Sequence, residues 1–241
     1  MRTALITGAA GGMGRAISSA LIEQGYQMVL VDRDEAALKT MAQSHGDKVF
    51  PWVLDITNVA KVDQLPGCLP QAFREIDVLI NNAGHDVGGR KRFDQGSADD
   101  WTAIIETNLI GMMRVTRAVL PGMVARNRGD VVNMGSISAL RMVTDMAPYS
   151  ASKAGVHMLS DIIRGELANT GVRVTEILPG LTRTGIVRSR YRGDVAQEKE
   201  YFDQFEMALE PEDVARSVVY ALSQPPQVQV AQIVILPVNR W

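Results

Sequence analysis

The sequence predicts an α/β protein with one doubly wound parallel sheet of about seven strands and helices on both faces. Short apolar runs alternate with segments of helical periodicity along all 241 residues, and a glycine-rich turn joins the first run to the first helix. No linker, low-complexity run or repeat beyond the βα unit divides the chain. We therefore expect a single domain over residues 1–241.

The chain is expected to begin with a strand, a glycine turn, a helix and a second strand. Residues 2–7 predict a short buried strand that runs into Gly8-Ala-Ala-Gly-Gly-Met-Gly14, and residues 28–31 predict the second strand, which ends in Asp32. The helix between them is expected to stop at Gly25. Its apolar stripe consists of Ala16, Ile17, Ala20 and Leu21. These elements make one βαβ unit.

The glycine turn predicts a phosphate-binding loop. Glycines let the backbone turn tightly and approach a pyrophosphate, whose charge meets the free N–H groups of the helix N-terminus. The spacing is T-G-x-x-x-G-x-G rather than the commoner G-x-G-x-x-G, so a turn without a ligand is the alternative. Asp32, 18 residues after Gly14, favours a dinucleotide site.

Asp32 also indicates which dinucleotide is expected. A carboxylate at this position binds the ribose 2′-hydroxyl and repels a 2′-phosphate, which favours NAD over NADP. Arg33 favours NADP instead, because an arginine directly after the strand can pair with the 2′-phosphate. No basic residue lies inside the glycine turn.

The strand and helix pattern continues to the end of the chain. Further strands are expected at residues 49–54, 76–80, 172–178 and 228–236, and at Val131-Val132. The segment 59–73 predicts a short or broken helix, because it contains Pro66, Gly67 and Pro70. A last helix is expected to begin at residues 210–213.

A helix is expected after Ser97, a suitable N-cap followed by acids in the first turn. Asn108 is a polar residue in its apolar stripe and needs hydrogen-bond partners if it is buried. The stripe expected to face the core comprises Trp101, Ile104, Ile105, Asn108, Leu109, Met112 and Met113.

The stretch Asn133–Lys153 carries the candidate chemistry. Tyr149 and Lys153 are four residues apart, so on a helix they lie on one face. A lysine ammonium there favours the charged form of a phenol, which predicts a Tyr149 pKa below about 10 and an acid or base near neutral pH. Ser136, at the end of the preceding strand, is placed to hydrogen-bond the same substrate oxygen.

Composition excludes several classes of protein. The net charge is −2, and 25 basic and 27 acidic residues are interspersed, so neither a nucleic-acid surface nor a membrane patch is expected. The single cysteine, Cys68, fits a reducing compartment. No apolar run approaches the roughly 18 residues that span a bilayer, and the N-terminus does not resemble a signal peptide. We expect a cytoplasmic protein with a small-molecule substrate.

Together these residues resemble the short-chain dehydrogenase/reductase family over essentially the whole chain. The resemblance implies a Rossmann-type fold and hydride transfer between NAD and a secondary alcohol or its ketone, with no metal, because the cofactor supplies the chemistry. The matching pieces are Thr7-Gly8-x-x-x-Gly12-x-Gly14, Asp32, Asp55-Ile56, Asn81-Asn82-Ala83-Gly84, Asn108, Ser136, Tyr149-x-x-x-Lys153 and Pro179-Gly180-x-x-x-Thr184.

The resemblance implies four catalytic residues. Tyr149 would be the general acid/base and Ser136 would hold the substrate oxygen. Lys153 would bind the nicotinamide ribose and lower the tyrosine pKa, and Asn108 would hold a water in a proton relay. It also implies a homo-oligomer, a tetramer or a dimer, through the helices that carry Asn108 and Tyr149.

The resemblance implies a set of cofactor contacts as well. Asp55 and Ile56 would flank the adenine, Asn82–Gly84 would line the adenosine side, and Thr184 would meet the carboxamide. The full set is Gly8, Gly12, Met13, Gly14, Asp32, Arg33, Asp55, Ile56, Asn82, Ala83, Gly84, Tyr149, Lys153, Pro179, Gly180 and Thr184.

A narrower resemblance concerns the substrate. Residues 117–129 and 209–237 are similar to the branch that oxidises small 3-hydroxy acids such as serine and allo-threonine. That branch usually prefers NADP and carries basic residues where this chain has Asp32. A 3-oxoacyl-thioester or broad ketone reductase is the alternative enzyme, and a non-catalytic NAD sensor or scaffold is the alternative class.

Charge near the proposed chemistry predicts an acidic substrate. Residues 181–205, the lid segment, are rich in arginine and lack clean periodicity, which predicts an irregular lid over the substrate. An arginine can bind a carboxylate with two parallel hydrogen bonds. Arg141 is the first choice, Arg183 the second, and His85 also lies near the expected site.

Overall fold

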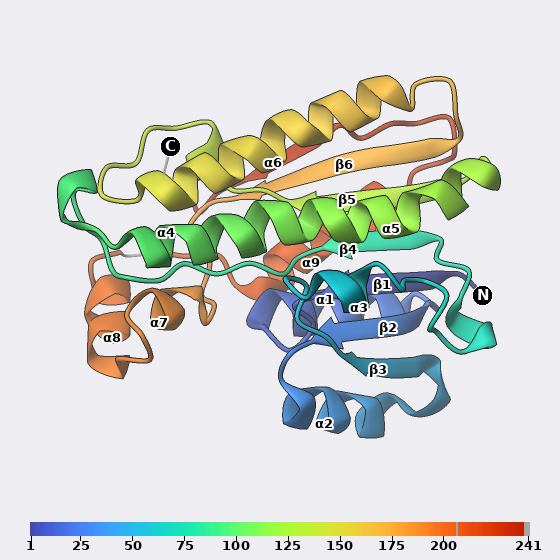
Figure 1. Ribbon diagram of the computed structural model, residues 1–241, viewed down its shortest axis with the longest axis horizontal. Coiled ribbons are helices and arrows are strands. Elements are labelled where there is room, and N and C mark those ends of the chain that lie inside the picture. The colour runs from blue at the N-terminus through green and yellow to red at the C-terminus, as the bar shows by residue number, and fades with distance from the viewer. Residues whose placement is uncertain (206, 239–241) are drawn as a thin grey trace.

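The computed structural model describes residues 1–205 and 207–238, and in these residues seven parallel strands form one sheet (Figure 1). The strand order is β3-β2-β1-β4-β5-β6-β7, so the direction of winding reverses between β1 and β4. This confirms the predicted single-domain, doubly wound Rossmann-type sheet. The strands are β1 Thr3–Thr7, β2 Gln27–Asp32, β3 Val49–Val53, β4 Val78–Asn81, β5 Gly129–Met134, β6 Val172–Pro179 and β7 Gln232–Ile235.

Helices cover both faces of the sheet. Helices α1, α2 and α9 pack on one face, and α3, α5 and α6 pack on the other. The helices are α1 Gly12–Glu23, α2 Glu35–His45, α3 Val59–Val62, α4 Ala98–Ile105, α5 Met112–Ala125, α6 Ala147–Glu166, α7 Ile186–Arg190, α8 Val195–Asp203 and α9 Pro211–Ser223. Among the described residues no helix is both long enough and apolar enough to cross a membrane.

Alternation along the strands divides the core into two layers. In β1, Ala4 and Ile6 belong to the layer under α1 and α9, whereas Leu5 belongs to the layer under α5 and α6. All three are fully buried. Because both faces are covered, such strands are continuous apolar runs in the sequence.

The segment 59–73 is broken, as predicted. Helix α3 has only four residues, and a single 3-10 turn at Gln71–Phe73 is the other helical piece. The Asn58 side chain caps α3 by accepting a 3.1 Å hydrogen bond from the Lys61 N–H. Proline cannot donate to a helical hydrogen bond, which explains why the helix does not continue through Pro66 and Pro70.

A π turn at Glu106–Gly111 connects α4 to α5 and makes one long helical run (Figure 1). The turn adds a residue to the helical repeat and changes which side chains face the core. Met112 is buried, but Met113 is 41% exposed, so the predicted apolar stripe is wrong at Met113. Asn108, within the π turn, is buried as expected of a residue with partners.

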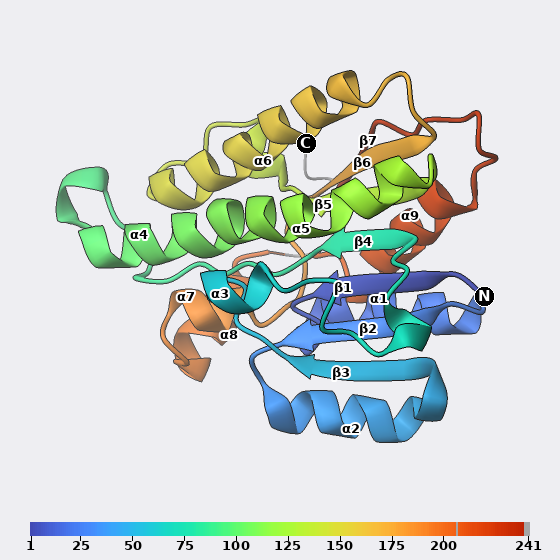
Figure 2. The same ribbon diagram turned by 45° about the vertical axis from the view of Figure 1, so that its right-hand side comes forward.

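The lid segment is not irregular, contrary to the prediction. It contains α7 and α8, and Figure 2 shows both helices beyond the end of the sheet toward which the strands point. The Asp194 side chain caps α8 by accepting hydrogen bonds from the N–H groups of Ala196 and Gln197. Helices of five and nine residues are too short to produce a clear period in the sequence.

The two edges of the sheet are β3 and β7. Pro51 occupies the centre of the five-residue strand β3, opposite Leu30 of β2. Proline has no N–H to donate and is confined to edge strands for that reason. The last strand, β7, is four residues long and is shorter than the predicted 228–236.

Candidate active site

Two adjoining cavities lie at the carboxyl ends of the strands. The first, about 410 Å³, is lined by the glycine turn and by residues that follow β2, β3 and β4. The second, about 390 Å³, is lined by Ser136, Arg141 and parts of the lid segment. The walls common to both are Met13, Gly135, Tyr149, Thr184 and Ile186. Ligands of open parallel sheets bind at this edge.

The glycine turn leaves room for a ligand beside the backbone. Gly8 has φ +67°, and a Cβ at Gly14 would lie 2.1 Å from the Gly8 carbonyl oxygen, so neither position accepts a side chain. A Cβ at Gly12 would meet only ordinary contacts at 3.6 Å. Among the described residues no side chain caps α1, so its first N–H groups are available to an anion at the cavity.

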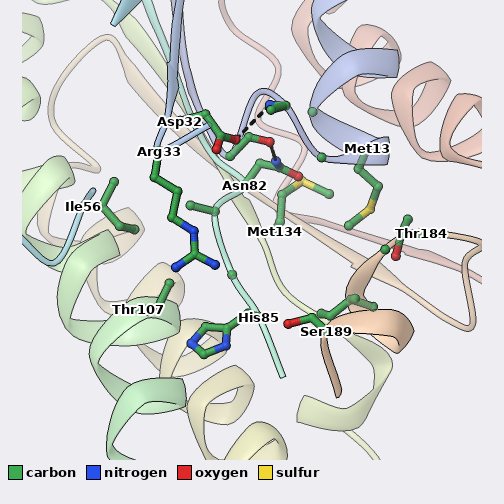
Figure 3. Close-up of a pocket in the computed structure, with 18 of the residues that line it drawn as sticks. Met13, Asp32, Arg33, Ile56, Asn82, His85, Thr107, Met134, Thr184 and Ser189 are labelled. Atoms are coloured by element: carbon green, nitrogen blue, oxygen red, sulfur yellow. Dashed lines mark hydrogen bonds between the residues drawn. The ribbon is translucent and has the colours of Figure 1, made fainter. Parts of the chain in front are cut away.

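Asp32 is hydrogen-bonded to the backbone, whereas Arg33 is exposed. The Asp32 carboxylate accepts hydrogen bonds from the N–H of Ala10 at 2.9 Å and from the N–H of Asp34 at 3.0 Å. Arg33 is exposed and extends its guanidinium into the first cavity (Figure 3). Partial burial acts to raise the pKa of the Asp55 carboxyl, but hydrogen bonds from Thr57 and the charge of Arg33 lower it overall.

Asn82 joins the end of β4 to the glycine turn. Its Nδ2 donates to the carbonyl oxygens of Thr7 at 3.0 Å and of Gly8 at 2.9 Å. Its Oδ1 is buried and has no hydrogen-bond partner in the described part of the chain, although Asn82 lines the first cavity. An open glycine cradle, an uncapped helix N-terminus and this acceptor fit a nicotinamide dinucleotide.

Lys153 connects α6 to β5. Its Nζ is buried and donates a hydrogen bond of 2.8 Å to the carbonyl oxygen of Met134. Tyr149 lies one turn earlier, with its ring centroid 5.8 Å from that Nζ, and is hydrogen-bonded to Ser136. The structure therefore brings Ser136, Tyr149 and Lys153 together, as the sequence predicts.

Asn108 lies behind this group. Its Nδ2 donates to the His85 carbonyl at 3.0 Å and to the Ser152 hydroxyl at 3.1 Å, and its Oδ1 accepts from the His85 N–H at 2.8 Å. A π turn re-aims the side chains within a helix and is frequent at functional sites. Here it directs Asn108 to the segment after β4 and to α6.

The expected low pKa of Tyr149 is not found. Desolvation, together with the charge of Asp86, raises the pKa of Tyr149 to about 12, although Ser136 and Arg190 act in the opposite direction. Burial lowers the pKa of Lys153 to about 8, against the charge of Glu176. The sequence shows the near lysine but not the burial or Asp86, which come from packing of distant segments.

The predicted substrate residues fall in different places. Arg141 lines the second cavity, whereas His85 lines the first. Arg183 lines neither; its Nε lies 3.4 Å from a Glu210 oxygen, and its guanidinium lies over Phe202. The prediction for Arg183 is therefore wrong on position, because this ion pair directs it away from Tyr149.

The predicted cofactor residues lie in the first cavity with two exceptions. Pro179 and Gly180 line the second cavity instead. The residues that do line the first cavity are Gly8, Gly12, Met13, Gly14, Asp32, Arg33, Asp55, Ile56, Asn82, Ala83, Gly84, Tyr149, Lys153 and Thr184. Thr107 and Ser189 also line it and are visible in Figure 3, but no motif in the sequence marks them.

Comparison with known proteins agrees with this geometry. A family model described as short chain dehydrogenase matches residues 2–194. The NADP-dependent 3-hydroxy acid dehydrogenase YdfG of Escherichia coli (strain K12) is 36% identical over 238 residues, which are 98% of this chain and 95% of that protein. The protein of the same name from Salmonella typhi is 35% identical over 237 residues, with the same two coverages.

Solved structures agree as well. A closed form of serine dehydrogenase complexed with NADP⁺ has a TM-score of 0.96 at 34% identity, covering 99% of this chain and 96% of that one. Serine dehydrogenase from Escherichia coli has a TM-score of 0.87 at 33% identity, covering 99% of each chain.

These relatives contradict the expected preference for NAD. Both 3-hydroxy acid dehydrogenases are named NADP-dependent, and the closed form of serine dehydrogenase was solved with NADP⁺. The interpretation of Asp32 is therefore wrong, and its contacts give a physical reason: two backbone N–H groups already hold its carboxylate, while Arg33 extends a positive charge into the cavity. The family model matches most of the chain, and the relatives are at least 33% identical over almost all of it. The chain therefore belongs to the short-chain dehydrogenase/reductase family and is an oxidoreductase that acts on CH–OH groups.

Proposed function

We propose that the protein is an NADP-dependent dehydrogenase of small 3-hydroxy acids. The observation that carries the proposal is the second cavity, which is lined by Ser136 and Tyr149 and by three arginines, Arg90, Arg141 and Arg190. A guanidinium binds and orients a carboxylate. The names of the 3-hydroxy acid and serine dehydrogenases that the chain resembles support the same substrate class.

The side chains suit proton transfer at the substrate hydroxyl. Tyr149 accepts the hydroxyl proton as phenolate during oxidation and returns it as phenol during reduction. Ser136 hydrogen-bonds the same oxygen, the Lys153 ammonium favours the phenolate, and Lys153 would hold the ribose of the cofactor. Bound NADP⁺ would supply the acceptor for the hydride that leaves the carbinol carbon. Asn108 holds the segment after β4 against α6, next to the path of the proton.

Arg33 supports NADP as the cofactor. Its guanidinium extends into the first cavity at the end of β2, where the 2′-phosphate of a bound dinucleotide is expected. The Asp32 carboxylate is held by the N–H groups of Ala10 and Asp34, which offset its charge. The positive charge of Arg33 therefore outweighs the negative charge of Asp32 at the expected position of the 2′-phosphate.

Reduction of a larger ketone is the second candidate function. Apolar side chains also line the second cavity, among them Val143, Met146, Leu181 and Val187, and these favour a substrate with a hydrocarbon chain. A 3-oxoacyl thioester or a broad ketone substrate has that character. A lid role for residues 181–205 serves either reaction, since α7 and α8 border the cavity.

A substrate screen tests the proposal. NADPH absorbance is followed with NADP⁺ and serine, allo-threonine and other 3-hydroxy acids, and with NADPH and 3-oxoacyl thioesters or neutral ketones. Higher kcat/KM for the acids than for their methyl esters supports the proposed substrate. Faster reaction of thioesters or neutral ketones supports the second candidate. Cofactor binding without turnover of any of these substrates contradicts both.

We also propose that the protein is a cytoplasmic dimer or tetramer. Apolar side chains are exposed on the outer faces of the helical run α4–α5 and of α6 and supply a surface for a second copy. They are Ile110, Met113, Met158 and Ile162, each between 41% and 57% exposed. Light scattering after size exclusion measures the mass, and Met158→Glu is expected to lower it.

A further inference from the structure

Arg190 is the last residue of α7, and its guanidinium is buried. Not all of its nitrogens have a hydrogen-bond partner in the described part of the chain. Its side chain is 5% exposed, and its Nε donates a 2.6 Å hydrogen bond to Oδ2 of Asp86, whose side chain is 6% exposed. The Arg190 carbonyl accepts a 2.9 Å hydrogen bond from the Gly89 N–H. Arg190 thus connects the lid segment to the loop after β4.

The ion pair leaves one nitrogen of Arg190 without an acceptor. A guanidinium carries five N–H donors, and Asp86 receives only the Nε proton in this pair. Nη1 is buried and has no hydrogen-bond partner in residues 1–205 and 207–238. A buried donor of a charged group that stays unpaired is destabilising, and most buried polar groups have an acceptor in the protein, in ordered water or in a ligand.

The surroundings indicate where that partner would lie. Arg190 lines the second cavity together with Ser136 and Tyr149. The ring of Tyr201, from α8, covers the guanidinium with its centroid 5.1 Å away, which orients the group. An oxygen acceptor that enters this cavity meets a fixed, desolvated cation near the tyrosine.

We propose that Arg190 binds the substrate carboxylate through Nη1 and sets the preference for acids. This inference rests on the proposed function, and it replaces Arg183, which is held at Glu210 outside the cavity. Its ligand is the carboxylate of a small hydroxy acid whose hydroxyl lies at Ser136 and Tyr149. Since Arg190 belongs to the lid segment, binding of the acid also holds that segment in place.

A purely structural ion pair makes a different prediction. If Arg190 and Asp86 only tie the lid segment to the loop after β4, removing the pair harms acidic and neutral substrates equally. If Arg190 binds the carboxylate, the acid loses far more than its methyl ester. The ratio of kcat/KM for a 3-hydroxy acid to that for its methyl ester therefore separates the two explanations.

The experiment measures this ratio with NADP⁺ for wild type and variants. Arg190→Met combined with Asp86→Asn removes both charges, so neither buried ion is left unpaired. The ratio is expected to fall on the order of 10- to 100-fold, the effect of losing a charge-assisted hydrogen bond. Arg188→Met is the matched control, because Arg188 lies on the same helix but pairs with Glu198 outside both cavities. Its ratio is expected to equal that of wild type.

Asp86→Asn alone keeps the test decisive if the double variant does not fold. It retains Arg190 and removes the anion that competes with the substrate, so the ratio is expected to stay equal or to rise. A lower ratio in Asp86→Asn, or a ratio within about twofold of wild type in a folded double variant, overturns the inference. Wild type that oxidises neither acid nor ester overturns the proposed function instead.

Discussion

The Lys153 ammonium donates its 2.8 Å hydrogen bond to the carbonyl of Met134, the last residue of β5. Ser136 follows two residues later, and Tyr149 precedes Lys153 by one helical turn. One side chain thus links the strand that ends before the serine to the helix that carries the tyrosine. Gly135, directly after β5, and Tyr149 of α6 both belong to the wall that the two cavities share.

Lys153→Ala is expected to lower both turnover and cofactor affinity, because the variant loses this link and the charge beside the phenol. Stopped-flow turnover and NADPH fluorescence titration measure the two effects separately. A variant with normal NADPH affinity and reduced kcat would contradict a role for Lys153 in binding the cofactor.

Tyr149→Phe removes only the proton-transfer group. We expect kcat to fall by about 10²- to 10⁴-fold, the usual contribution of a general acid or base. NADPH affinity is expected to stay near that of wild type, since the ring and its packing remain. Retention of more than about a tenth of kcat would exclude Tyr149 as the general acid/base.

Arg33→Ala tests the source of the NADP preference. Loss of a guanidinium at the 2′-phosphate is expected to lower kcat/KM with NADP⁺ on the order of 10-fold or more and to leave kcat/KM with NAD⁺ nearly unchanged. Lys39→Ala, which removes a positive charge from α2 outside the cavity lining, is the control. Equal losses with both cofactors would show that Arg33 does not recognise the phosphate.

Asp86→Asn is expected to change the pH dependence of oxidation. Oxidation requires the Tyr149 phenolate, so its rate rises with pH toward the pKa of that phenol, which burial and Asp86 raise to about 12. Removal of the Asp86 charge lowers this pKa, and the rising limb of kcat/KM moves to lower pH. If the rising limb of kcat/KM in Asp86→Asn lies at the same pH as in wild type, Asp86 does not affect the pKa of Tyr149 in the working enzyme.

Two glycines of the same loop are expected to respond differently to alanine. A Cβ at Gly14 would overlap the Gly8 carbonyl, so Gly14→Ala is expected to lower the Tm by about 5 °C or more. At Gly12 the Cβ has room, so Gly12→Ala keeps the Tm of the free protein but weakens NADPH binding by filling part of the cavity. Calorimetry with and without NADPH measures both, and a normal Tm for Gly14→Ala would contradict the packing argument.

Local patterns predicted the parts of the site that depend on neighbouring residues. The glycine turn lies between β1 and α1, and Tyr149 and Lys153 share a face of α6, because in each case a few consecutive residues determine the geometry. The fold was predictable for a related reason, since strands buried on both faces are recognisable as apolar runs. Helices α7 and α8 are too short to leave a clear period in the sequence.

Long-range contacts explain what the sequence could not reveal. Arg190 and Asp86 are 104 residues apart, and no spacing rule connects an arginine of the lid segment to an aspartate after β4. The effect of Asp32 on cofactor choice depends on the Ala10 and Asp34 N–H groups, which the fold brings to its carboxylate. The pKa of Tyr149 depends on burial by distant segments in the same way.

Pro51 limits strand pairing at one edge of the sheet. An exposed edge strand offers a row of donors and acceptors to strands of other molecules, and such pairing is a route to aggregation. At the β3 edge the central residue has no donor, so a foreign strand meets a break in the middle of the ladder. The proline therefore disfavours pairing between this edge and a strand of another molecule.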